Sequence, residues 1–446
     1  MKRKLLNAVL VSTMVLILMA MPLLGAAAEN TQIALFNWDG GETIKVMEDM
    51  IARFEKANPG ITIKNMNFPA DYDTKITTMV AAGTPPDIAF LESGTVLYPF
   101  SSEGKLSNLE DFMKNDPDYD ESSMMEALKY YDGDKLIGYN ATGAETIAMF
   151  YNTQLFDKYG VEYPPAKFSE AWDWDKFVDV AKTLTIDKNG KNAHDPDFDP
   201  ENIATYGVSF GKWWAVYMPF IYSMGGNYLN EDGTKIGLNE PAGITALQNL
   251  ADLIWVHHVS PTATASSILP GLAESFMTNK IAMVFDGQWM NTPLMSEKVP
   301  YNVAALPKMG EKAATIAVGS SLSIFDTPNK EISWKVFKAL AEPAFALPLC
   351  ATGNVMPGNA ASYTVEGAKE WITENHPSNQ YDTFCLSMID GSARPTVTGT
   401  VINFNQINDV LSPALDLLWS GEKFAQEALA PVADQANALV AGYRKK

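Results

Sequence analysis

Strand-length and helix-length apolar patterns alternate near the start of this 446-residue chain. The apolar run at 33–36 predicts a strand, and apolar residues at helical spacing over 44–54 predict a helix after it. Two more short apolar runs, at 61–63 and 87–91, flank a second helical pattern at 74–82. This order of strands and helices predicts an α/β fold that begins with a parallel sheet. Further along the chain we expect an extended run at 141–151, an amphipathic helix at 174–184, strand-like pieces over 276–290 and a final helix at 425–443.

The ends of these predicted strands carry aromatic and polar residues. Trp38 and Asp39 follow the first strand, and Glu92 and Ser93 follow the third. Because ligands of such sheets bind beyond the carboxyl ends of the strands, we expect all four side chains at one ligand-binding edge. The alternative is that Asp39 and Glu92 are solvated surface acids and that Trp38 packs in the core.

The first 28 residues have the pattern of an export signal. Basic residues at 2–4 precede an uncharged apolar stretch, and three alanines at 26–28 provide a signal peptidase site. We therefore expect cleavage after Ala28 and a mature protein in the periplasm. A retained membrane anchor is the alternative, because the stretch is long enough to span a bilayer. No cysteine lies near Ala28, so we do not expect a lipoprotein.

Length and charge narrow the class of protein. Without the 28-residue signal, 418 of the 446 residues remain, which is too many for one hydrophobic core and enough for two lobes. The formal net charge of the whole chain is −20. This balance argues against nucleic acids and anionic membranes as partners, since both attract clustered lysine and arginine. We expect a freely diffusing monomer.

Cysteine and histidine positions predict no metal centre. Export would permit a disulfide between Cys350 and Cys385, but the sequence leaves two buried free thiols equally open. The four histidines are scattered. The acidic insertion at 187–199 resembles calcium loops in its aspartates, yet it lacks the Gly-then-Glu spacing of an EF-hand. We therefore expect a solvated insertion and no bound metal.

Several short segments, in one order along the chain, resemble segments of the extracellular solute-binding proteins of ABC importers, the group that includes maltose-binding proteins. RFEKANPGI at 53–61 resembles the first helix-to-strand turn of that family, and AAGTPPDI at 81–88 resembles its AAGxxPDI segment. The other matching segments lie at 131–138, 149–156, 218–226, 279–289, 305–307 and 421–429. Each is a turn or a helix cap with little specificity, but their shared order covers nearly the whole mature chain.

The resemblance implies two α/β lobes, the type II periplasmic-binding-protein fold, with a ligand cleft between lobes that close by hinge motion. The N-terminal lobe would comprise 29–144 and 319–358, and the C-terminal lobe would comprise 145–318 and 359–446. The resemblance also implies capture of a mono- or oligosaccharide and its delivery to a membrane permease.

Aromatic and polar residues near predicted strand ends are candidates for sugar contacts. A sugar has an apolar C–H face that stacks on aromatic rings, and hydroxyls that bind carboxylates, amides or arginine. Trp213 and Trp214 follow a predicted strand. By the resemblance, Trp289 stacks on sugar and Glu145 supplies a ligand-binding carboxylate. Further polar candidates in late loops are Asn354, Arg394, Asn403 and Asn405. The alternative roles are packing for the tryptophans, and helix caps or turns for the asparagines.

Other functions remain open on sequence alone. The same fold could bind a polyamine, a phosphate ester or a peptide, or it could present its ligand to a receptor. A secreted glycosidase with paired carboxylates is a further alternative. The sequence contains no phosphate loop or catalytic metal motif, and carboxylates are expected in a sugar-binding cleft, so we expect a binding protein that has no cofactor and is not an enzyme.

Overall fold

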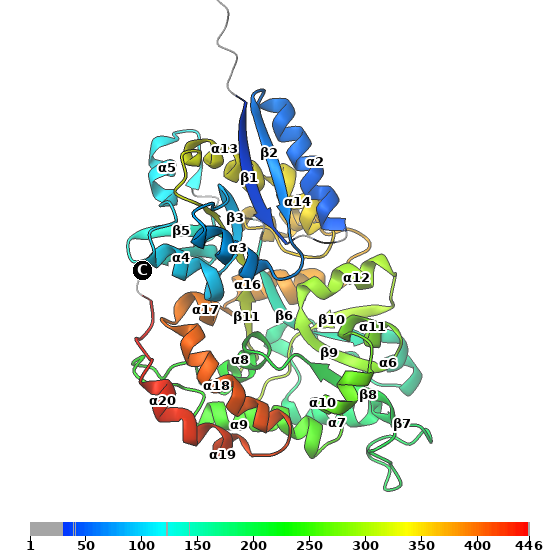
Figure 1. Ribbon diagram of the computed structural model, residues 1–446. Helices are drawn as coiled ribbons and strands as arrows, with labels where there is room; N and C mark the ends of the chain where they lie inside the picture. Colours follow the sequence, from blue (N-terminus) through cyan, green and yellow to red (C-terminus); the bar gives the residue numbers. More distant parts are fainter. Residues whose placement is uncertain (1–29, 39, 41, 122–123, 142, 445–446) are drawn as a thin grey trace, which may run out of the picture.

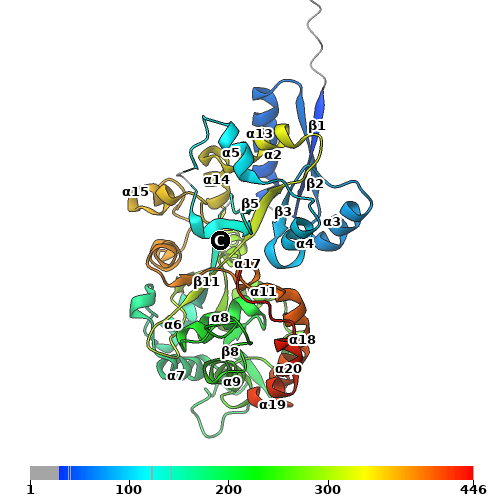
Figure 2. The same ribbon diagram turned by 90° about the vertical axis from the view of Figure 1, so that its left-hand side faces the viewer.

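The computed structural model describes residues 30–38, 40, 42–121, 124–141 and 143–444. The predicted signal peptide at 1–28 and the candidate Asp39 lie outside the described residues. A search of the described part for a helix long and apolar enough to cross a bilayer finds none. Two β-sheets with helices packed around them form two lobes, one above the other in Figure 1 and Figure 2.

The first sheet lies in the upper lobe and mixes parallel and antiparallel strands. In spatial order its strands are β2 (Ile61–Asn67), β1 (Thr31–Asn37), β3 (Ile88–Glu92), β12 (Ser320–Ile324), β5 (Lys135–Tyr139) and β4 (Lys129–Asp132). β1 runs parallel to β2 and β3, as predicted, whereas β12 is antiparallel to β3 and β5. The parallel sheet predicted for the first three strands is thus confirmed, and the later strands of the same sheet pair antiparallel.

Helices of the upper lobe bury their apolar faces against this sheet and against each other. They are α2 (Glu42–Ala57), α3 (Tyr72–Ala81), α4 (Tyr98–Ser102), α5 (Leu109–Asn115), α13 (Lys330–Ala341) and α14 (Pro343–Cys350). The apolar residues of α2 recur at helical spacing, and Met47, Met50 and Phe54 among them are buried. The chain then turns at Gly60, whose φ of 93° is strained for other residues, and enters β2.

The second sheet lies in the lower lobe. In spatial order its strands are β13 (Ala393–Arg394), β11 (Thr315–Val318), β6 (Glu145–Asn152), β9 (Ile281–Gly287), β8 (Ile203–Phe210) and β7 (Ile186–Asp187), and β10 (Tyr301–Ala304) also pairs with β6. The chain thus passes from the first sheet to the second between β5 and β6. It returns between β11 and β12, where Gly319 is the only intervening residue.

Helices of the lower lobe also bury their apolar faces against the sheet and against each other. They are α6 (Thr153–Tyr159), α7 (Trp174–Leu184), α8 (Trp214–Ser223), α9 (Pro241–Trp255), α10 (Ala263–Ile268), α11 (Leu272–Met277), α12 (Asn291–Ser296), α18 (Phe404–Trp419), α19 (Ala425–Leu429) and α20 (Ala433–Asn437). The predicted helix at 174–184 is confirmed as α7. Its cap Asp173 accepts the backbone N–H of Lys176 at 2.8 Å, and its apolar face buries Phe177, Ala181 and Leu184.

Three expected element boundaries differ from the structure. The extended run expected from 141 begins as a strand only at Glu145. Phe276, expected in a strand with 281–287, belongs to α11, which ends in a turn at Asn279 with φ of 58°. The helix expected over 425–443 is divided at Pro431, because proline cannot donate to the preceding turn.

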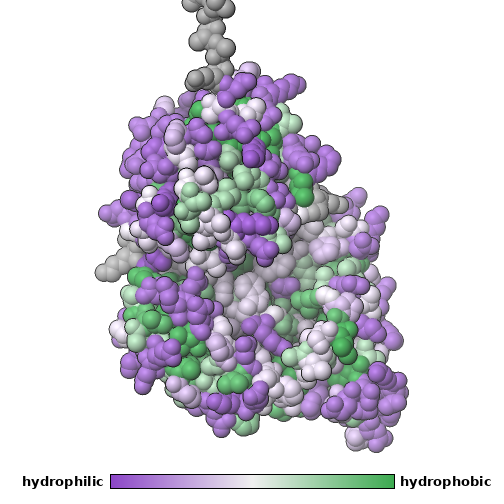
Figure 3. Space-filling view, in the orientation of Figure 1, coloured by the Kyte–Doolittle hydropathy of each residue, from purple (hydrophilic) through white to green (hydrophobic). Residues whose placement is uncertain are grey.

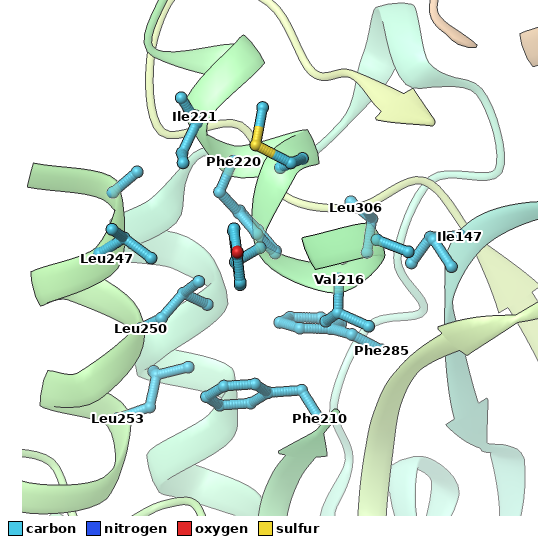
Figure 4. Close-up of a cluster of buried hydrophobic side chains, with 14 of the residues drawn as sticks. Ile147, Phe210, Val216, Phe220, Ile221, Leu247, Leu250, Leu253, Phe285 and Leu306 are labelled. Atoms are coloured by element: carbon cyan, nitrogen blue, oxygen red, sulfur yellow. The ribbon is translucent and has the colours of Figure 1, made fainter. Parts of the chain in front are cut away.

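The main core of the lower lobe lies between α8, α9 and the sheet. Figure 4 shows Val216 and Phe220 of α8 facing Leu247 and Leu250 of α9 on one side and Phe285 of β9 on the other. All five side chains are fully buried. Each contributes about 1.5–3 kcal/mol relative to an exposed side chain, which makes this lobe a rigid support for residues at its upper edge.

A second buried cluster crosses the junction of the lobes. It contains Phe150 of β6 and Leu294 of α12 from the lower lobe, together with Leu349 of α14 from the upper one. The segment after α14 joins the same cluster through Tyr363 and Trp371, on either side of α15 (Val365–Ala368), and through Phe384, just before α16 (Leu386–Ile389). The short helix α17 (Val397–Thr400) follows. In contrast to this apolar cluster, the outer surface is polar, and hydrophilic residues cover most of the upper lobe in Figure 3.

Candidate ligand-binding cleft

A cleft of about 560 Å³ lies between the two lobes. Residues from the ends of β1 and β3 line it from the upper lobe, and residues from β6 and the start of α8 line it from the lower lobe. The carboxyl ends of β1 and β3 point into this space, as expected for a sheet of this type. A cleft of this volume is in the range that encloses small organic ligands.

The segment from β11 to β12 joins the lobes along one side of the cleft. Val318 of β11 pairs with Glu145 of β6, and two residues later Ser320 of β12 pairs with Glu92 of β3. Between them, Gly319 has φ of 147°, and a Cβ there would lie 2.1 Å from Nδ2 of Asn140. Only glycine fits this position, and the crossing holds one glutamate from each lobe at its two ends.

The two glutamates have raised pKa values. Burial raises the pKa of Glu145 to about 8, and the nearby charge of Glu92 adds to the rise. Glu92 contacts the water of the open cleft, but the surrounding protein still desolvates it enough to raise its pKa, and the charge of Asp73 contributes. Neither glutamate forms an ion pair with another described residue. Their charges are therefore uncompensated by neighbouring cations.

Indole rings form the opposite side of the cleft. Trp213 and Trp214 meet edge to face with ring centroids 5.2 Å apart, and the ring of Trp289 lies 6.1 Å from that of Trp213. Trp213 retains 37% of its surface exposed in the cleft, so its face is available to a ligand. A fourth indole, Trp38 at the end of β1, packs against Tyr72 at 4.6 Å from the upper lobe.

Two glycines let the lower-lobe indoles lie close to the backbone. A Cβ at Gly211 would lie 2.7 Å from Cδ1 of Trp213, and a Cβ at Gly287 would lie 2.1 Å from the ring of Trp289. Asp286 accepts the backbone N–H of Gly287 at 2.8 Å and also bonds the side chain of Trp289. Burial raises the pKa of Asp286 to about 6, although these two hydrogen bonds lower it. Asp286 therefore positions the ring of Trp289.

The structure brings most of the sequence-predicted site residues together. Those that line the cleft are Trp38, Glu92, Glu145, Trp213, Trp214, Trp289 and Asn354. The backbone of Ser93 follows β3 directly, at the start of a short helical turn. The acids and indoles come from strand ends and helix starts in both lobes, which is why one cleft collects them.

Three residues that the sequence suggested as ligand contacts are not part of the described lining of the cleft. Arg394 lies over the ring of Tyr222, 5.7 Å from its centroid. The amide of Asn403 donates to the carbonyl oxygen of Leu439 at 3.0 Å, and the amide of Asn405 donates to the carbonyl oxygen of Gly94. The last bond joins the two lobes. The two amides thus already have partners, and Arg394 interacts with an aromatic ring.

The cleft also contains residues that the sequence reasoning missed. Asp71 and Asp73 follow the end of β2, and Thr396 and Thr398 follow β13. The strand-end rule could have found the two aspartates, because β2 ends at the same edge as β1 and β3. The threonines follow a two-residue strand that carries no sequence signal.

The acidic insertion is organised by its own backbone. Asp187 is buried, and its carboxylate accepts the backbone N–H groups of Asn189, Lys191 and Asp199 at 2.8–3.0 Å. Among the residues that the structure describes, no group of three acidic, histidine or cysteine side chains could hold a metal ion. Cys350 and Cys385 are both buried free thiols, so of the two possibilities that the sequence left open the structure contains the unpaired one.

Comparisons with known proteins agree with this architecture. The chain matches the family described as bacterial extracellular solute-binding protein over residues 39–346. The sn-glycerol-3-phosphate-binding periplasmic protein UgpB of Salmonella typhimurium is 23% identical over 442 residues, which cover 94% of this chain and 95% of that protein.

Two solved structures share the fold. The ABC substrate-binding protein Lmo0181 of Listeria monocytogenes, in complex with cycloalternan, has a TM-score of 0.77 and 23% identity, over 92% of this chain and 98% of that one. Maltose-bound MalE3 of T. maritima has a TM-score of 0.71 and 18% identity, over 92% and 100% of the two chains. The two-lobed fold predicted from the sequence is confirmed.

Proposed function

Because the chain belongs to the bacterial extracellular solute-binding protein family, we propose that it captures a carbohydrate outside the inner membrane and delivers it to the permease of an ABC importer. On this proposal the protein acts in the periplasm as a monomer, after cleavage of its signal peptide. It has no cofactor and releases its ligand unchanged. We propose for the two lobes the boundaries expected from the resemblance, with 29–144 and 319–358 in one lobe and 145–318 and 359–446 in the other.

The observation that carries this proposal is the meeting of indole rings and carboxylates in one interlobe cleft. A sugar ring has two apolar faces and a rim of hydroxyls, so it needs flat aromatic contacts and hydrogen-bond acceptors together. Trp213, Trp214 and Trp289 would stack on sugar faces, and Glu92 and Glu145 would accept hydrogen bonds from hydroxyls. Trp38 and Asn354 would complete the contacts, and Asp39 and Ser93 remain predicted contributors.

The likeness to a maltose-bound protein supports a sugar ligand, although it extends to this chain only through the shared fold. A phosphate ester is favoured less. UgpB is named for binding sn-glycerol-3-phosphate, but the described lining of this cleft includes no lysine, arginine or histidine. Phosphate groups in proteins are commonly held by arginine or lysine, and here they would face carboxylates.

Delivery would depend on movement of the lobes about the crossing at Gly319, between β11 and β12. An empty protein would open at this crossing, and a bound sugar would hold the acidic and the aromatic sides together. The protein contributes binding and orientation, and the reaction at the membrane belongs to the permease. A glycosidase would instead need one carboxylic acid that stays protonated and acts as proton donor. Glu145 meets this requirement, because its pKa is raised to about 8. Turnover must therefore be measured directly.

Intrinsic fluorescence of the mature protein tests the proposal. The protein is titrated with monosaccharides, maltose and longer maltodextrins, and in parallel with spermidine and glycerol 3-phosphate. We expect a saturable change in tryptophan fluorescence with a saccharide, since four indoles line the cleft. Chromatography of the ligand after incubation should recover it intact. Absence of saturation with every saccharide would overturn the carbohydrate proposal, and cleavage of the ligand would overturn the non-enzymatic one.

A further inference from the structure

The charge of the cleft is one-sided. Asp71, Asp73, Glu92 and Glu145 line it, and no cationic side chain accompanies them among the described lining residues. We propose that the captured saccharide carries a basic nitrogen, and that its ammonium group binds between Glu92 and Glu145 beside the indole rings. This inference rests on the proposed carbohydrate-binding function and narrows it to amino sugars.

The backbone holds these two glutamates at the same crossing. Glu145 pairs with Val318 at the end of β11 and Glu92 pairs with Ser320 at the start of β12, so only Gly319 separates their two partners along the chain. A Cβ built on Gly319 would lie 3.2 Å from Oε2 of Glu145, which places that carboxylate directly at the crossing. Each lobe therefore contributes one acid to the same end of the cleft. A cation there would contact both lobes.

The lack of a paired cation at this point favours a cationic ligand over a neutral one. Desolvation raises the pKa of both glutamates, the charge of Glu92 raises that of Glu145 further, and the charge of Asp73 does the same for Glu92. A partly desolvated carboxylate without a partner is costly, and a cation between the two glutamates would stabilise both in their charged forms. It would form an ion pair that the described lining of the cleft does not supply.

The indole rings are an independent reason to expect an ammonium group on the ligand. An ammonium group is attracted to the face of tryptophan within about 6 Å of the ring centre, and the attraction strengthens where water is excluded. Trp213 and Trp289, with centroids 6.1 Å apart, offer two such faces in the same cleft. The rings also stack on the apolar face of a sugar, so one wall serves both parts of an amino sugar. A linear polyamine would use the charge but leave the flat faces without a ring to stack on.

Proton release follows from this arrangement. At pH 6.5 the carboxyl group of Glu145 is mostly protonated in the empty cleft, because its pKa is raised to about 8. An ammonium group stabilises the carboxylate form, so binding should expel a proton into the solvent. The other titratable groups around Glu145 are Glu92, Tyr130, Cys350 and Tyr363. Burial raises the pKa of the two tyrosines and the thiol, so they stay protonated.

The test compares matched saccharides that differ only in charge. Glucosamine and its β-1,4-linked oligosaccharides are titrated into the mature protein at pH 6.5, next to their N-acetylated counterparts. We expect the free amines to bind at least about tenfold more tightly, a free-energy difference of about 1.4 kcal/mol. Calorimetry in buffers of different ionisation enthalpy should detect proton release approaching one per amine-bearing ligand, and none for the acetylated form.

Variants connect the effect to the two acids. Glu145→Gln keeps the shape of the side chain but removes its titration. It should therefore abolish proton release and lower the ratio of the affinities for the amine and the N-acetylated sugar toward one. Glu92→Gln should lower the preference as well. The matched control is Glu103→Gln, an exposed glutamate outside the cleft, which should keep both the preference and the proton release.

The outcomes separate this inference from the proposed function. Equal affinity for the amine and acetylated sugars, or a preference that survives both glutamine substitutions, overturns the amino-sugar inference and leaves carbohydrate capture standing. Binding of spermidine with no saccharide bound overturns both. A tenfold preference that depends on Glu145 and is accompanied by proton release supports the inference.

Discussion

The two walls of the cleft differ in their chemistry. Three of the four carboxylates in its described lining, Asp71, Asp73 and Glu92, come from the upper lobe. Three of the four indoles come from the lower lobe, and only Trp38 comes from the upper. The upper wall suits the hydroxyl or ammonium rim of a ligand, and the lower wall suits its flat faces. Neither lobe alone presents a complete site.

The crossing at Gly319 relates the two walls to each other. Glu145 belongs to the lower lobe but lies near Glu92 of the upper lobe, because β11 pairs with β6, β12 pairs with β3, and only Gly319 separates β11 from β12. Closing the lobes would bring the acidic rim against the aromatic wall. Substitutions on each side, and at the crossing between them, therefore test whether the two walls contribute to binding in different ways.

The largest expected effect lies on the aromatic wall. Trp289→Ala should weaken sugar binding by about 3 kcal/mol, because stacked tryptophans in desolvated pockets dominate binding energies. The ring also packs against both buried clusters, so the apo protein should lose about 1 kcal/mol of unfolding free energy. Fluorescence titration and urea unfolding measure the two quantities. Trp255→Ala is the control, since Trp255 is exposed on α9 outside the cleft. A stability loss without an affinity loss would make Trp289 a core residue.

A somewhat smaller effect is expected at the crossing. Gly319→Ala should cost about 2 kcal/mol of unfolding free energy, because its φ of 147° and the nearby amide of Asn140 leave no room for a Cβ. Binding should weaken as well, since the crossing sets the relative position of Glu92 and Glu145. The control is Gly271→Ala, where an added Cβ meets no atom within 4 Å and φ is negative. Equal stability of the two variants would show that the crossing is not strained.

The acidic side should make stability depend on pH. Folded Glu145 holds its proton up to about pH 8, whereas the unfolded chain loses it near the ordinary pKa of 4.5. The folded state therefore binds more protons in this window, and the free energy of unfolding should fall as pH rises from 4.5 through 8. Glu145→Gln should remove about 1–2 kcal/mol of that fall, measured by urea unfolding at pH 5 and pH 8.5. Asp286, with its pKa raised to about 6, adds a smaller fall at the acidic end in both proteins. An unchanged pH profile in Glu145→Gln would show that this carboxyl is not desolvated.

The smallest effect concerns a polar contact. Asn354 lines the cleft, and Asn354→Ala should weaken sugar binding by about 1 kcal/mol, the typical contribution of one hydrogen bond. Arg394→Gln is the matched comparison, because Arg394 lies over Tyr222 outside the described lining. Its effect on affinity should stay below about 0.3 kcal/mol, which is near the limit expected for a surface change. A larger loss in Arg394→Gln than in Asn354→Ala would reverse the assignment of these two loops.

Much of the fold could be predicted from local pattern. The helix at 174–184 was predictable because its cap and its apolar spacing act within a few residues. The strand-end rule correctly placed Trp38 and Glu92 at the cleft, since parallel strands end at a common edge. The position of β12 between β3 and β5 was not predictable in this way, because Ser320 of β12 pairs with Glu92 of β3 and Leu322 pairs with Tyr139 of β5, residues far apart in the chain.

The prediction of polar site residues was weaker for a physical reason. An amide in a loop can bind a sugar or a backbone carbonyl, and the sequence does not state which partner lies nearby. Asn405 donates to Gly94 of the other lobe, and Asn403 donates to Leu439. Asp71 and Asp73 reach the cleft because of the path of the loop after β2.

The amino-acid sequence by itself determined the two-lobed α/β fold and the family, because alternating apolar patterns, caps and turns are local and occur in a shared order. It also determined which residue types could recognise a sugar. Only the tertiary structure decided that an acidic wall faces an aromatic one and that Glu145 lies beside Glu92. The physical reason is that charge repulsion, desolvation and ring stacking depend on distances through space, and those distances are set by the packing of strands far apart in the chain.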